Sequence, residues 1–393
     1  MRAISKINKN EIKNKFVLLR TDLNSDVLNK KVILSERIKQ SAETINFLKK
    51  RGAKVVILAH QGRAGKTDFL SLKQHHKYLT RYVKIKFMPD IDIGGKKSIK
   101  AIEKLKPNEA ILLENIRFIE DEFIPEKKEN KILKIASKMD IYVNDAFSNS
   151  HREHTSMLIP RYFPKIKSYA GFILEREVES LKKIKLRNCL YLLGGAKPED
   201  NIKLLNPSNK NKVLTGGLFG QLCIIANGKD LGAQNDYLKK TISDYEKNLN
   251  ELKKILKDKF LQEKIKTPLD FAVKKEGKRK ELILGLFPSK EEIFDIGEKT
   301  IKRYVSEIKK AKAIYMKGPF GFCSEKEFSK GTHEILKAIS NSKGFSVIGG
   351  GHLSDAIKSS KIPQKKFGHI SLSGGALLRY LNGEKLPGLE VLN

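Results

Sequence analysis

The sequence predicts an α/β protein built from two doubly wound, parallel-sheet domains. Its 393 residues are long for one domain and suit two domains of about 180–200 residues each. Short β-branched and leucine-rich runs alternate with longer amphipathic stretches, and this alternation starts again near the middle of the chain. Glycine pairs directly follow several apolar runs, as expected at the carboxyl ends of strands in open parallel sheets.

Four apolar runs in the first half predict buried strands, and an amphipathic stretch between them predicts a helix. The strands are Phe16–Arg20, Lys54–His60, Glu109–Leu113 and Asp140–Asn144. The stretch Ser35–Arg51 carries apolar residues at helical spacing. Such strand–helix–strand alternation is typical of a parallel sheet covered on both faces.

The second half repeats the pattern. Its predicted strands are Cys189–Leu193, Lys212–Leu214, Lys264–Val273, Ala311–Met316 and Phe345–Ile348. The charged stretch Glu175–Lys185 is the expected helical connector between the domains, and Tyr237–Lys266 has the pattern of an amphipathic helix with a solvated face. We therefore expect two Rossmann-like sheets joined by a helix.

The chain carries a formal net charge of +33, mostly from lysine. Such a charge suggests nucleic-acid binding, but the lysines are evenly spread and no basic block joins an aromatic RNA-binding signature. Anionic small substrates are favoured over nucleic acid, and a basic RNA-associated protein stays as an alternative. No apolar run approaches the ~18 residues of a membrane span, and Met1–Lys15 lacks the apolar block of a signal peptide. We expect a cytoplasmic monomer with no membrane partner.

Familiar metal and nucleotide motifs do not fit this sequence. The three widely spaced cysteines favour buried reduced thiols. The segment 62–67 ends like a P-loop but has His60 where the first glycine is required. The segment 151–154 is not the HExxH of zinc enzymes, so no protein ligand for a metal is assigned.

Arginine is scarce beside lysine, so its positions are informative. Five arginines lie at or near predicted strand ends or at the opening of a helix: Arg20, Arg37, Arg63, Arg117 and Arg152. A guanidinium group pairs bidentately with phosphate or carboxylate. Any one of them alone is more simply a surface ion pair, but five in one half predict a pocket for a small polyanion.

Glycine runs mark strand ends in the second half. They are Gly194-Gly195, Gly216-Gly217, Gly349-Gly350-Gly351 and Gly374-Gly375. Glycine lets backbone N–H groups approach phosphate oxygens closely. A turn alone explains one such pair, but four in one domain predict a cradle for nucleotide phosphates.

Taken in order, the strand-end segments resemble phosphoglycerate kinase from about residue 16 to the end. In the first half they are Leu19–Asn24, Ser35–Arg37, Ala59–Arg63, Leu113–Phe118, Val143–Phe147 and His151-Arg152. In the second half they are Leu193–Lys197, Pro268–Ala272, Phe294–Thr300, Gly318–Gly321, Lys330–Thr332, Ile348–Gly351, His369–Ser371 and Leu386–Glu390. Each piece is common, but the ordered set is specific, and its wording is closer to the archaeal branch.

The resemblance implies phosphoryl transfer between 1,3-bisphosphoglycerate and ADP, giving 3-phosphoglycerate and ATP, with Mg²⁺ carried by the nucleotide. It implies that residues 1–167 hold phosphoglycerate, that 168–185 form the connecting helix, that 186–370 hold the nucleotide and that 371–393 pack back on the first domain. Catalysis would come from domain closure and from positive charge around the migrating phosphoryl group.

The implied site residues follow from matching positions. The glycerate ligand would contact Asp22, Asn24, Arg37, His60, Arg63, Arg117 and Arg152. The migrating group would meet Arg37, Lys197, Gly374 and Gly375. The nucleotide would meet Gly194, Gly195, Lys197, Gly216, Gly217, Pro319, Gly321, Glu325, Gly349, Gly350, Gly351 and His352.

Five departures from the family's bacterial and eukaryotic pattern fall on the nucleotide side, and one of them is Leu218, which stands where that pattern has a third glycine after Gly216-Gly217. Asn201 stands where that pattern has a second lysine, and Lys317 stands where it has asparagine. Ser324 replaces the ribose-contacting glutamate, with Glu325 next to it, and His352 replaces the aspartate that serves Mg²⁺. The metal ligand is therefore unknown, and a catalytically weakened member acting as a binding or regulatory protein stays as a second alternative.

Overall fold

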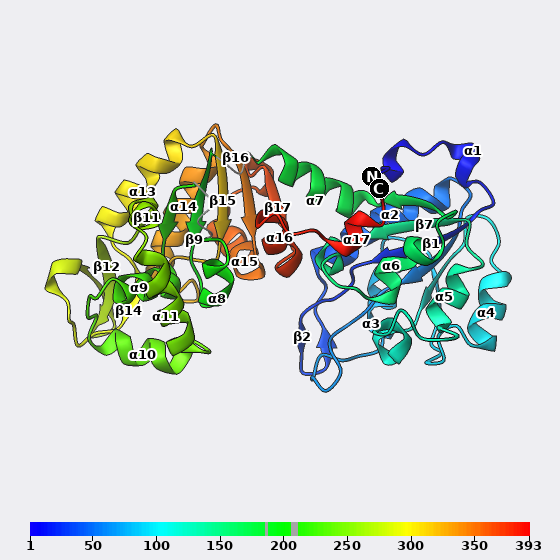
Figure 1. Cartoon of the computed structure of the whole chain (residues 1–393), viewed down its shortest axis with the longest axis horizontal. Helices are drawn as coiled ribbons and strands as arrows, with labels where there is room; N and C mark the ends of the chain where they lie inside the picture. Colours follow the sequence, from blue (N-terminus) through cyan, green and yellow to red (C-terminus); the bar gives the residue numbers. More distant parts are fainter. Residues whose placement is uncertain (185–187, 206–210) are drawn as a thin grey trace. The chain divides into compact units, whose positions relative to one another are not determined.

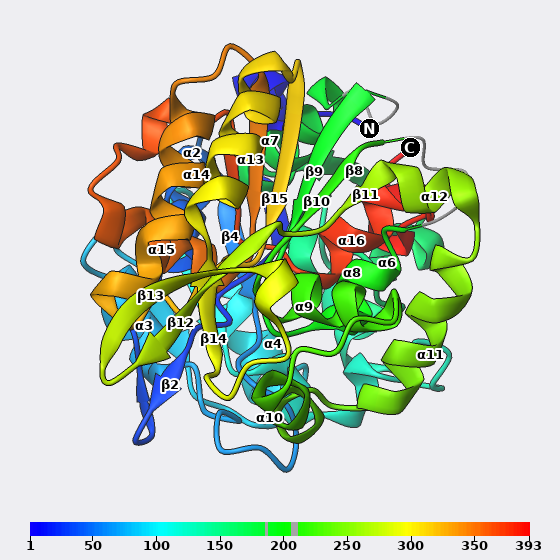
Figure 2. The ribbon, with the colours of Figure 1, turned by 90° about the vertical axis from the view of Figure 1, so that its left-hand side faces the viewer.

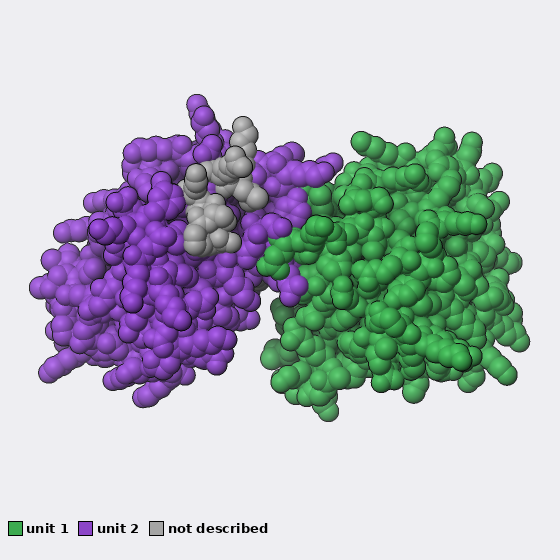
Figure 3. Space-filling view, in the orientation of Figure 1, with its two compact units in different colours: residues 1–178, 384–393 green, residues 179–383 purple. Residues whose placement is uncertain are grey.

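The computed structural model describes residues 1–184, 188–205 and 211–393, and their packing forms two compact units (Figure 1, Figure 3). The first unit is Met1–Val178 with Glu384–Asn393, and the second is Glu179–Gly383. Each unit contains one six-stranded parallel sheet. The predicted fold class is confirmed. None of the described helices is long and apolar enough to cross a membrane.

The sheet of the first unit has the strand order β5-β6-β4-β1-β7-β8. Its strands are β1 (Phe16–Thr21), β4 (Lys54–Leu58), β5 (Lys86–Met88), β6 (Ala110–Leu113), β7 (Ile141–Asp145) and β8 (Lys167–Ala170), and a separate hairpin pairs β2 (Val27–Leu28) with β3 (Lys31–Val32). The helices are α1 (Lys9–Ile12), α2 (Glu36–Lys50), α3 (Lys73–Leu79), α4 (Lys96–Glu103), α5 (Lys131–Ala136), α6 (Thr155–Tyr162), α17 (Pro387–Glu390) and the first part of α7 (Phe172–Lys183), whose residues from Glu179 belong to the second unit, with 3₁₀ turns η1 (Ile4–Lys6), η2 (Ile116–Phe118), η3 (Glu120–Glu122) and η4 (Phe147–Asn149).

Both faces of this sheet are buried, as its continuously apolar strands predict. Val17 and Leu19 of β1 lie in a core cluster that also holds Ile38 and Ile45 of α2. The intervening Leu18, which points to the opposite face, is also fully buried. The strands therefore leave only their carboxyl ends and loops for polar side chains that can meet a ligand.

The second unit has the strand order β11-β10-β9-β15-β16-β17, and Figure 2 shows β11, β10, β9 and β15 of this sheet. Its strands are β9 (Cys189–Leu193), β10 (Val213–Thr215), β11 (Ile265–Lys266), β15 (Ala313–Lys317), β16 (Phe345–Gly349) and β17 (His369–Ser371), and a three-stranded antiparallel sheet contains β12 (Asp270–Lys275), β13 (Lys278–Ile283) and β14 (Ile293–Ile296). The helices are α8 (Pro198–Ile202), α9 (Gly217–Ala226), α10 (Ala233–Thr241), α11 (Tyr245–Leu256), α12 (Lys259–Lys264), α13 (Glu298–Lys310), α14 (Lys330–Ser340), α15 (Gly351–Ser360) and α16 (Gly375–Leu381), with 3₁₀ turns η6 (Leu284–Leu286), η7 (Lys326–Ser329) and η8 (Gln364–Lys366).

Two sequence predictions in the second half are wrong in detail. The single strand predicted at Lys264–Val273 is two strands, because Pro268 lies between β11 in the parallel sheet and β12 in the antiparallel one. The helix predicted at Tyr237–Lys266 is divided among α10, α11 and α12. Asp244 takes a left-handed φ of 52° before α11, and the Asp258 carboxylate caps the amino end of α12.

The segments expected to connect the domains and to form the tail fall on several elements. Helix α7 runs through Phe172–Lys183, whereas the predicted end at Lys185 lies outside the described residues. The predicted tail 371–393 is divided, because β17 pairs with β16 and residues up to Gly383 pack in the second unit. In the first unit, the Asn144 side chain donates to the Gly388 carbonyl oxygen at 2.9 Å.

In each sheet the chain reverses direction of winding beside the first strand. In the first unit β1 lies between β4 and β7, and in the second β9 lies between β10 and β15. A crevice opens at such a switch point beyond the carboxyl ends of the strands. The loops after β1, β4 and β7 and the loops after β9, β10 and β15 are therefore the places to look for ligand sites.

The start of α7 depends on one buried carboxylate. Asp145 accepts hydrogen bonds from the backbone N–H groups of Ile173 and Leu174 and from the Thr44 hydroxyl, at 2.7, 3.2 and 2.6 Å. We expect Asp145→Ala to lower the free energy of unfolding in urea by about 2 kcal/mol or more, because a buried cap and its donors lose their acceptor. Glu179→Ala, on the exposed side of α7, is the control, and an Asp145→Ala protein as stable as this control would contradict the assignment.

Candidate active site

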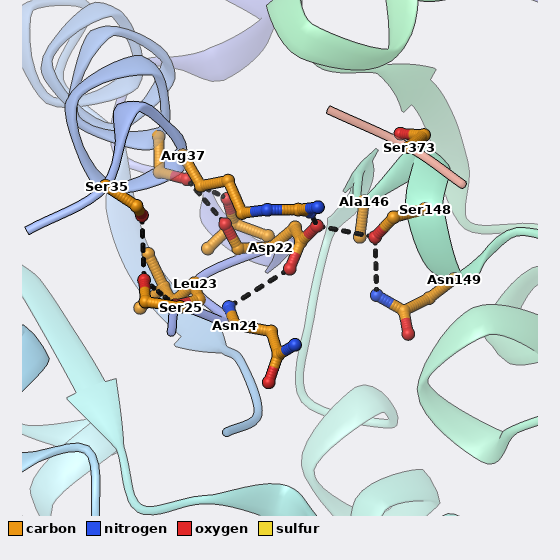
Figure 4. A network of polar contacts seen from close by, with 12 residues as sticks. Asp22, Leu23, Asn24, Ser25, Ser35, Arg37, Ala146, Ser148, Asn149 and Ser373 are labelled. Atoms are coloured by element: carbon orange, nitrogen blue, oxygen red, sulfur yellow. Dashed lines mark hydrogen bonds and ion pairs between the residues drawn. The ribbon is translucent and has the colours of Figure 1, made fainter. Parts of the chain in front are cut away.

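A polar network at the end of β1 holds the first predicted ligand residue (Figure 4). Asp22 is nearly buried, and its carboxylate accepts hydrogen bonds from the Arg37 guanidinium and the Ser148 hydroxyl. The other carboxylate oxygen accepts from the Asn24 backbone N–H at 3.1 Å. Burial lowers the pKa of Arg37 to about 10, so that it stays protonated at neutral pH. The structure thus brings Asp22 and Arg37 into one ion pair.

The loop after β4 is shaped by a buried amide. Gln61 accepts from the Ser25 backbone N–H and donates to the carbonyl oxygens of Ser25 and Asp68, at 2.9, 3.0 and 3.2 Å. Gly62 has a φ of 69°, and a Cβ there would collide with the Asp68 backbone. The Asn24 side-chain oxygen accepts from the Gly62 N–H at 2.8 Å. Asn24 therefore ties the two loops together with its oxygen and keeps its NH₂ group for other contacts.

His60 lies at the bottom of this region and is paired with a buried arginine. One Arg20 nitrogen lies 3.1 Å from His60 Nδ1, and both side chains are almost fully buried. Burial, with the nearby charges of Arg20 and Arg117, holds the pKa of His60 well below its ordinary value. His60 is therefore neutral at physiological pH and acts through hydrogen bonds instead of charge.

Arg117 follows β6 and lies beside Gly62 and His60, with one of its guanidinium nitrogens lacking a hydrogen-bond acceptor among the described residues. Its Nη1 donates to the Gly62 carbonyl oxygen at 2.6 Å, but its buried Nε has no hydrogen-bond partner among the described residues. Burial and the positive charges of Arg20 and Arg152 lower its pKa to about 10. A buried donor without an acceptor is rare in folded proteins and is accounted for by a ligand or water.

The remaining arginines lie within electrostatic range of Arg117. Both Arg63, which is exposed, and the half-buried Arg152 lower its pKa. The five arginines and His60 thus gather at the carboxyl edge of one sheet, although they come from five separate segments. Sequence reasoning missed Ser148, Ser156 and Glu122, which support this cluster, because no motif or spacing connects them to the arginines.

In the second unit the glycine-rich loops pack against one another. A Cβ at Gly194, Gly216 or Gly217 would lie within 3.0 Å of Phe320 or of the Pro319 carbonyl oxygen. The N–H groups of Gly195 and Gly217 donate to the carbonyl oxygens of Pro319 and Phe320, at 2.8 and 3.2 Å. These glycines join the loops after β9, β10 and β15, and their N–H groups are already used within the chain.

The other residues predicted to contact the nucleotide differ in whether their polar groups are already bonded within the chain or lie in open space. The Gly321 N–H donates to the Thr332 hydroxyl at 3.1 Å, and the Glu325 carboxylate pairs with Lys274 at 2.8 Å. In contrast, Cβ atoms at Gly350 and Gly374 would meet nothing within 4 Å. Gly350 and Gly374 precede α15 and α16, whose first N–H groups have no intrahelical acceptor. Gly349 ends β16, and the side chain of His352 lies outside the described part of the chain.

Two of these departures, Asn201 and Lys317, face each other at the end of β15. Lys317 Nζ lies 3.1 Å from an Asp200 carboxylate oxygen and 3.4 Å from the Asn201 side-chain oxygen. Burial lowers the pKa of Lys317, although Asp200 opposes this, and the charge of Lys197 adds to the lowering. Lysine and asparagine thus occupy 317 and 201 in the reverse of the arrangement expected from the resemblance, and Lys317 keeps a positive charge near Lys197 at the start of α8.

One doubly wound unit carries a cluster of arginines, and the other carries glycine-rich strand ends with Lys197 near Lys317. Together these features define a phosphotransferase of two α/β domains. The family model described as "Phosphoglycerate kinase" matches residues 7–384. A phosphoglycerate kinase of Methanopyrus kandleri is 37% identical over 99% of this chain and 97% of its own, and one of Methanothermus fervidus is 38% identical over 96% and 93%.

Solved structures agree with these relatives. Phosphoglycerate kinase from Pyrococcus horikoshii has a TM-score of 0.86 at 34% identity, covering 100% of this chain and 98% of that one. The enzyme from Coxiella burnetii has a TM-score of 0.81 at 26% identity, covering 99% and 98%. The chain belongs to the phosphoglycerate kinase family. The enzyme class and the reaction expected from the sequence are confirmed, and the two alternatives are not favoured.

The glycines separate into two kinds that one experiment distinguishes. Gly216→Ala should destabilise the fold by about 1–3 kcal/mol, because its Cβ would overlap the Phe320 ring. Gly374→Ala should unfold like the parent, since its φ of −86° and open surroundings accept a methyl group. Thermal unfolding of both variants is the measurement, and equal loss of stability in the two would contradict this division.

Proposed function

We propose that the arginine cluster of the first unit binds the phosphoglycerate. Asp22 and Asn24 would hold its hydroxyl and carboxylate, and Arg37, His60, Arg63, Arg117 and Arg152 would surround its anionic groups. The observation that carries this proposal is the buried Arg117 Nε, which lacks an acceptor beside three further guanidinium groups. A ligand bearing both phosphate and carboxylate matches such forks.

The strand ends of the second unit would hold the nucleotide. Lys197 is exposed at the cap of α8, and Lys317 is mostly buried behind it. Because Gly194, Gly195, Gly216 and Gly217 serve loop packing, we assign the direct phosphate contacts to the two lysines and to the backbone at Gly350, Gly351, Gly374 and Gly375. Pro319 and Gly321 would shape the wall of the site.

Phosphoryl transfer between the two substrates needs no covalent bond to a protein side chain. Phosphoryl transfer depends on positioning and on positive charge at the equatorial oxygens of the migrating group. Arg37 and Lys197 would supply that charge. Asp22, already paired with Arg37, suits the role of a hydrogen-bond acceptor more than that of a general base. Closure of the two domains remains our expectation for how both ligands meet.

Mg²⁺ would arrive with the nucleotide, whose charge it neutralises when bound. The described residues contain no cluster of three side chains that could hold a metal. The second unit's strand ends offer N–H groups and ammonium groups, which suit phosphate, and Mg²⁺ in such enzymes is held largely by phosphates and water. Asp355 is highly exposed and pairs with Lys358 at 3.5 Å, so we do not assign it to the metal.

The proposal is tested by a coupled assay with 1,3-bisphosphoglycerate and ADP, with Mg²⁺ and with EDTA. We expect turnover that requires Mg²⁺. Absence of turnover with both substrates and Mg²⁺ present would overturn it, and salt-dependent RNA binding without turnover would revive the RNA-associated alternative.

The first site prediction concerns the arginine cluster. Arg37→Ala and Arg152→Ala should each weaken 3-phosphoglycerate binding about 10- to 100-fold, because each removes a charge-assisted contact. Arg161→Ala, which removes an exposed arginine from α6, is the matched control. Titration calorimetry measures the affinities, and unchanged binding in both test variants would refute the assignment.

The second site prediction concerns Lys197. Lys197→Ala should lower kcat more than it raises the KM for ATP, because the ammonium group would act mainly on the migrating phosphoryl group. The expected loss is about 2–4 kcal/mol of transition-state stabilisation. Lys203→Ala, which removes the exposed lysine at the other end of α8, serves as the control, and parental turnover by Lys197→Ala would remove Lys197 from the mechanism.

A further inference from the structure

A chain of buried polar side chains runs beneath the arginine cluster and ends at Glu122. Its carboxylate accepts from the backbone N–H of Ser156 at 3.0 Å and from the Ser156 hydroxyl at 2.7 Å. The same hydroxyl accepts from Arg20 Nε at 2.9 Å. Glu122, Ser156 and Arg20 are all fully buried. The hydroxyl therefore has one defined orientation, with its hydrogen toward Glu122 and a lone pair toward Arg20.

The chain continues from Arg20 to His60. A guanidinium group has only donors, so the contact of 3.1 Å between Arg20 and His60 Nδ1 makes Nδ1 the acceptor. A neutral imidazole that accepts at Nδ1 carries its hydrogen on Nε2. His60 then offers an N–H donor and not a lone pair at its other nitrogen.

Glu122 also provides the nearby negative charge that this arrangement needs. Its charge raises the pKa of both Arg20 and Arg117 against the lowering by burial. A fully buried guanidinium without compensating charge is costly. Glu122 lies 3.5 Å from His154 Nδ1 as well, so it is enclosed by donors and cations.

We propose that Glu122 is a positioning residue for the phosphoglycerate site: acting through Ser156, it holds Arg20 charged and oriented, and Arg20 in turn fixes His60 as the Nε2–H tautomer that donates to the anionic ligand. Glu122 itself touches no ligand. This inference rests on the proposed role of His60 in binding phosphoglycerate.

Two variants interrupt the chain at different points. Glu122→Gln keeps the shape but removes the charge and one of the two acceptors used by Ser156. Ser156→Ala keeps the Glu122 charge but removes the acceptor of Arg20 Nε. The control is Glu120→Gln, in the same 3₁₀ turn, where the exposed carboxylate pairs only with Lys127 at 3.2 Å among the described contacts.

The readout is nitrogen NMR of the histidine rings in the ligand-free protein, which distinguishes a protonated from a bare ring nitrogen. We expect a single Nε2–H tautomer for His60 in the parent and in the Glu120→Gln control. Glu122→Gln and Ser156→Ala should show a mixture of tautomers. The KM for 3-phosphoglycerate should rise about tenfold or more in both, with an unchanged KM for ATP.

The outcomes separate this inference from the proposed function. If His60 keeps a single Nε2–H tautomer in both variants, the proposal is overturned even where the KM rises, because the effect would then be loss of packing. An Nδ1–H tautomer in the parent also overturns it. If instead His60→Ala binds 3-phosphoglycerate like the parent, the proposed function of His60 fails, and the tautomer result still reports on the chain from Glu122.

Discussion

A fully buried guanidinium is the feature on which the first unit's polar architecture depends. Arg20 lies beneath the carboxyl edge of the sheet because β1 is one of the two central strands and its last residues are covered on both faces. Each of its nitrogens therefore has to find an acceptor inside the protein. It finds them in the Thr21 carbonyl oxygen, the Ser156 hydroxyl and His60. Helix α6 carries Ser156 and so supplies one of these acceptors.

The second unit meets a different constraint, which is steric. Three loops approach so closely at the ends of β9, β10 and β15 that no side chain fits at Gly194, Gly216 or Gly217, where Phe320 and the Pro319 backbone already fill the space. Hydrogen bonds between the loops then use the backbone N–H groups of Gly195 and Gly217. The first unit thus presents side-chain cations on a polar scaffold, whereas the second presents lysines and helix starts around a tightly packed set of loops.

Most strands of the two sheets and the arginine cluster could be predicted from the sequence, and the features that could not be predicted were missed for physical reasons. Continuous apolar runs identified β1, β9 and β16, because buried parallel strands have no polar face to disguise them. The pattern did not separate β11 from β12, since apolar character says nothing about which sheet a strand joins. The arginines were predictable as a group from their strand-end positions. The glycine pairs were predicted to meet phosphate, but adjacency in sequence did not show that the neighbour filling their space is another loop.

The contact between Asn201 and Lys317 makes two positions of the chain interdependent. A lysine at 201 with Lys317 retained would bring a second ammonium group beside the first, which like charges disfavour in a partly buried place, and would break the hydrogen bond of 2.8 Å from Asn201 to the Gly194 carbonyl oxygen. An asparagine at 317 alone would leave Asp200 without its cation. Each of these single substitutions therefore leaves either two lysines or none at the two positions, whereas the double substitution would keep one. A change at only one of the two positions therefore introduces a conflict, and a hybrid that joins this chain's α8 to a β15 with asparagine at 317 would carry that conflict at the junction.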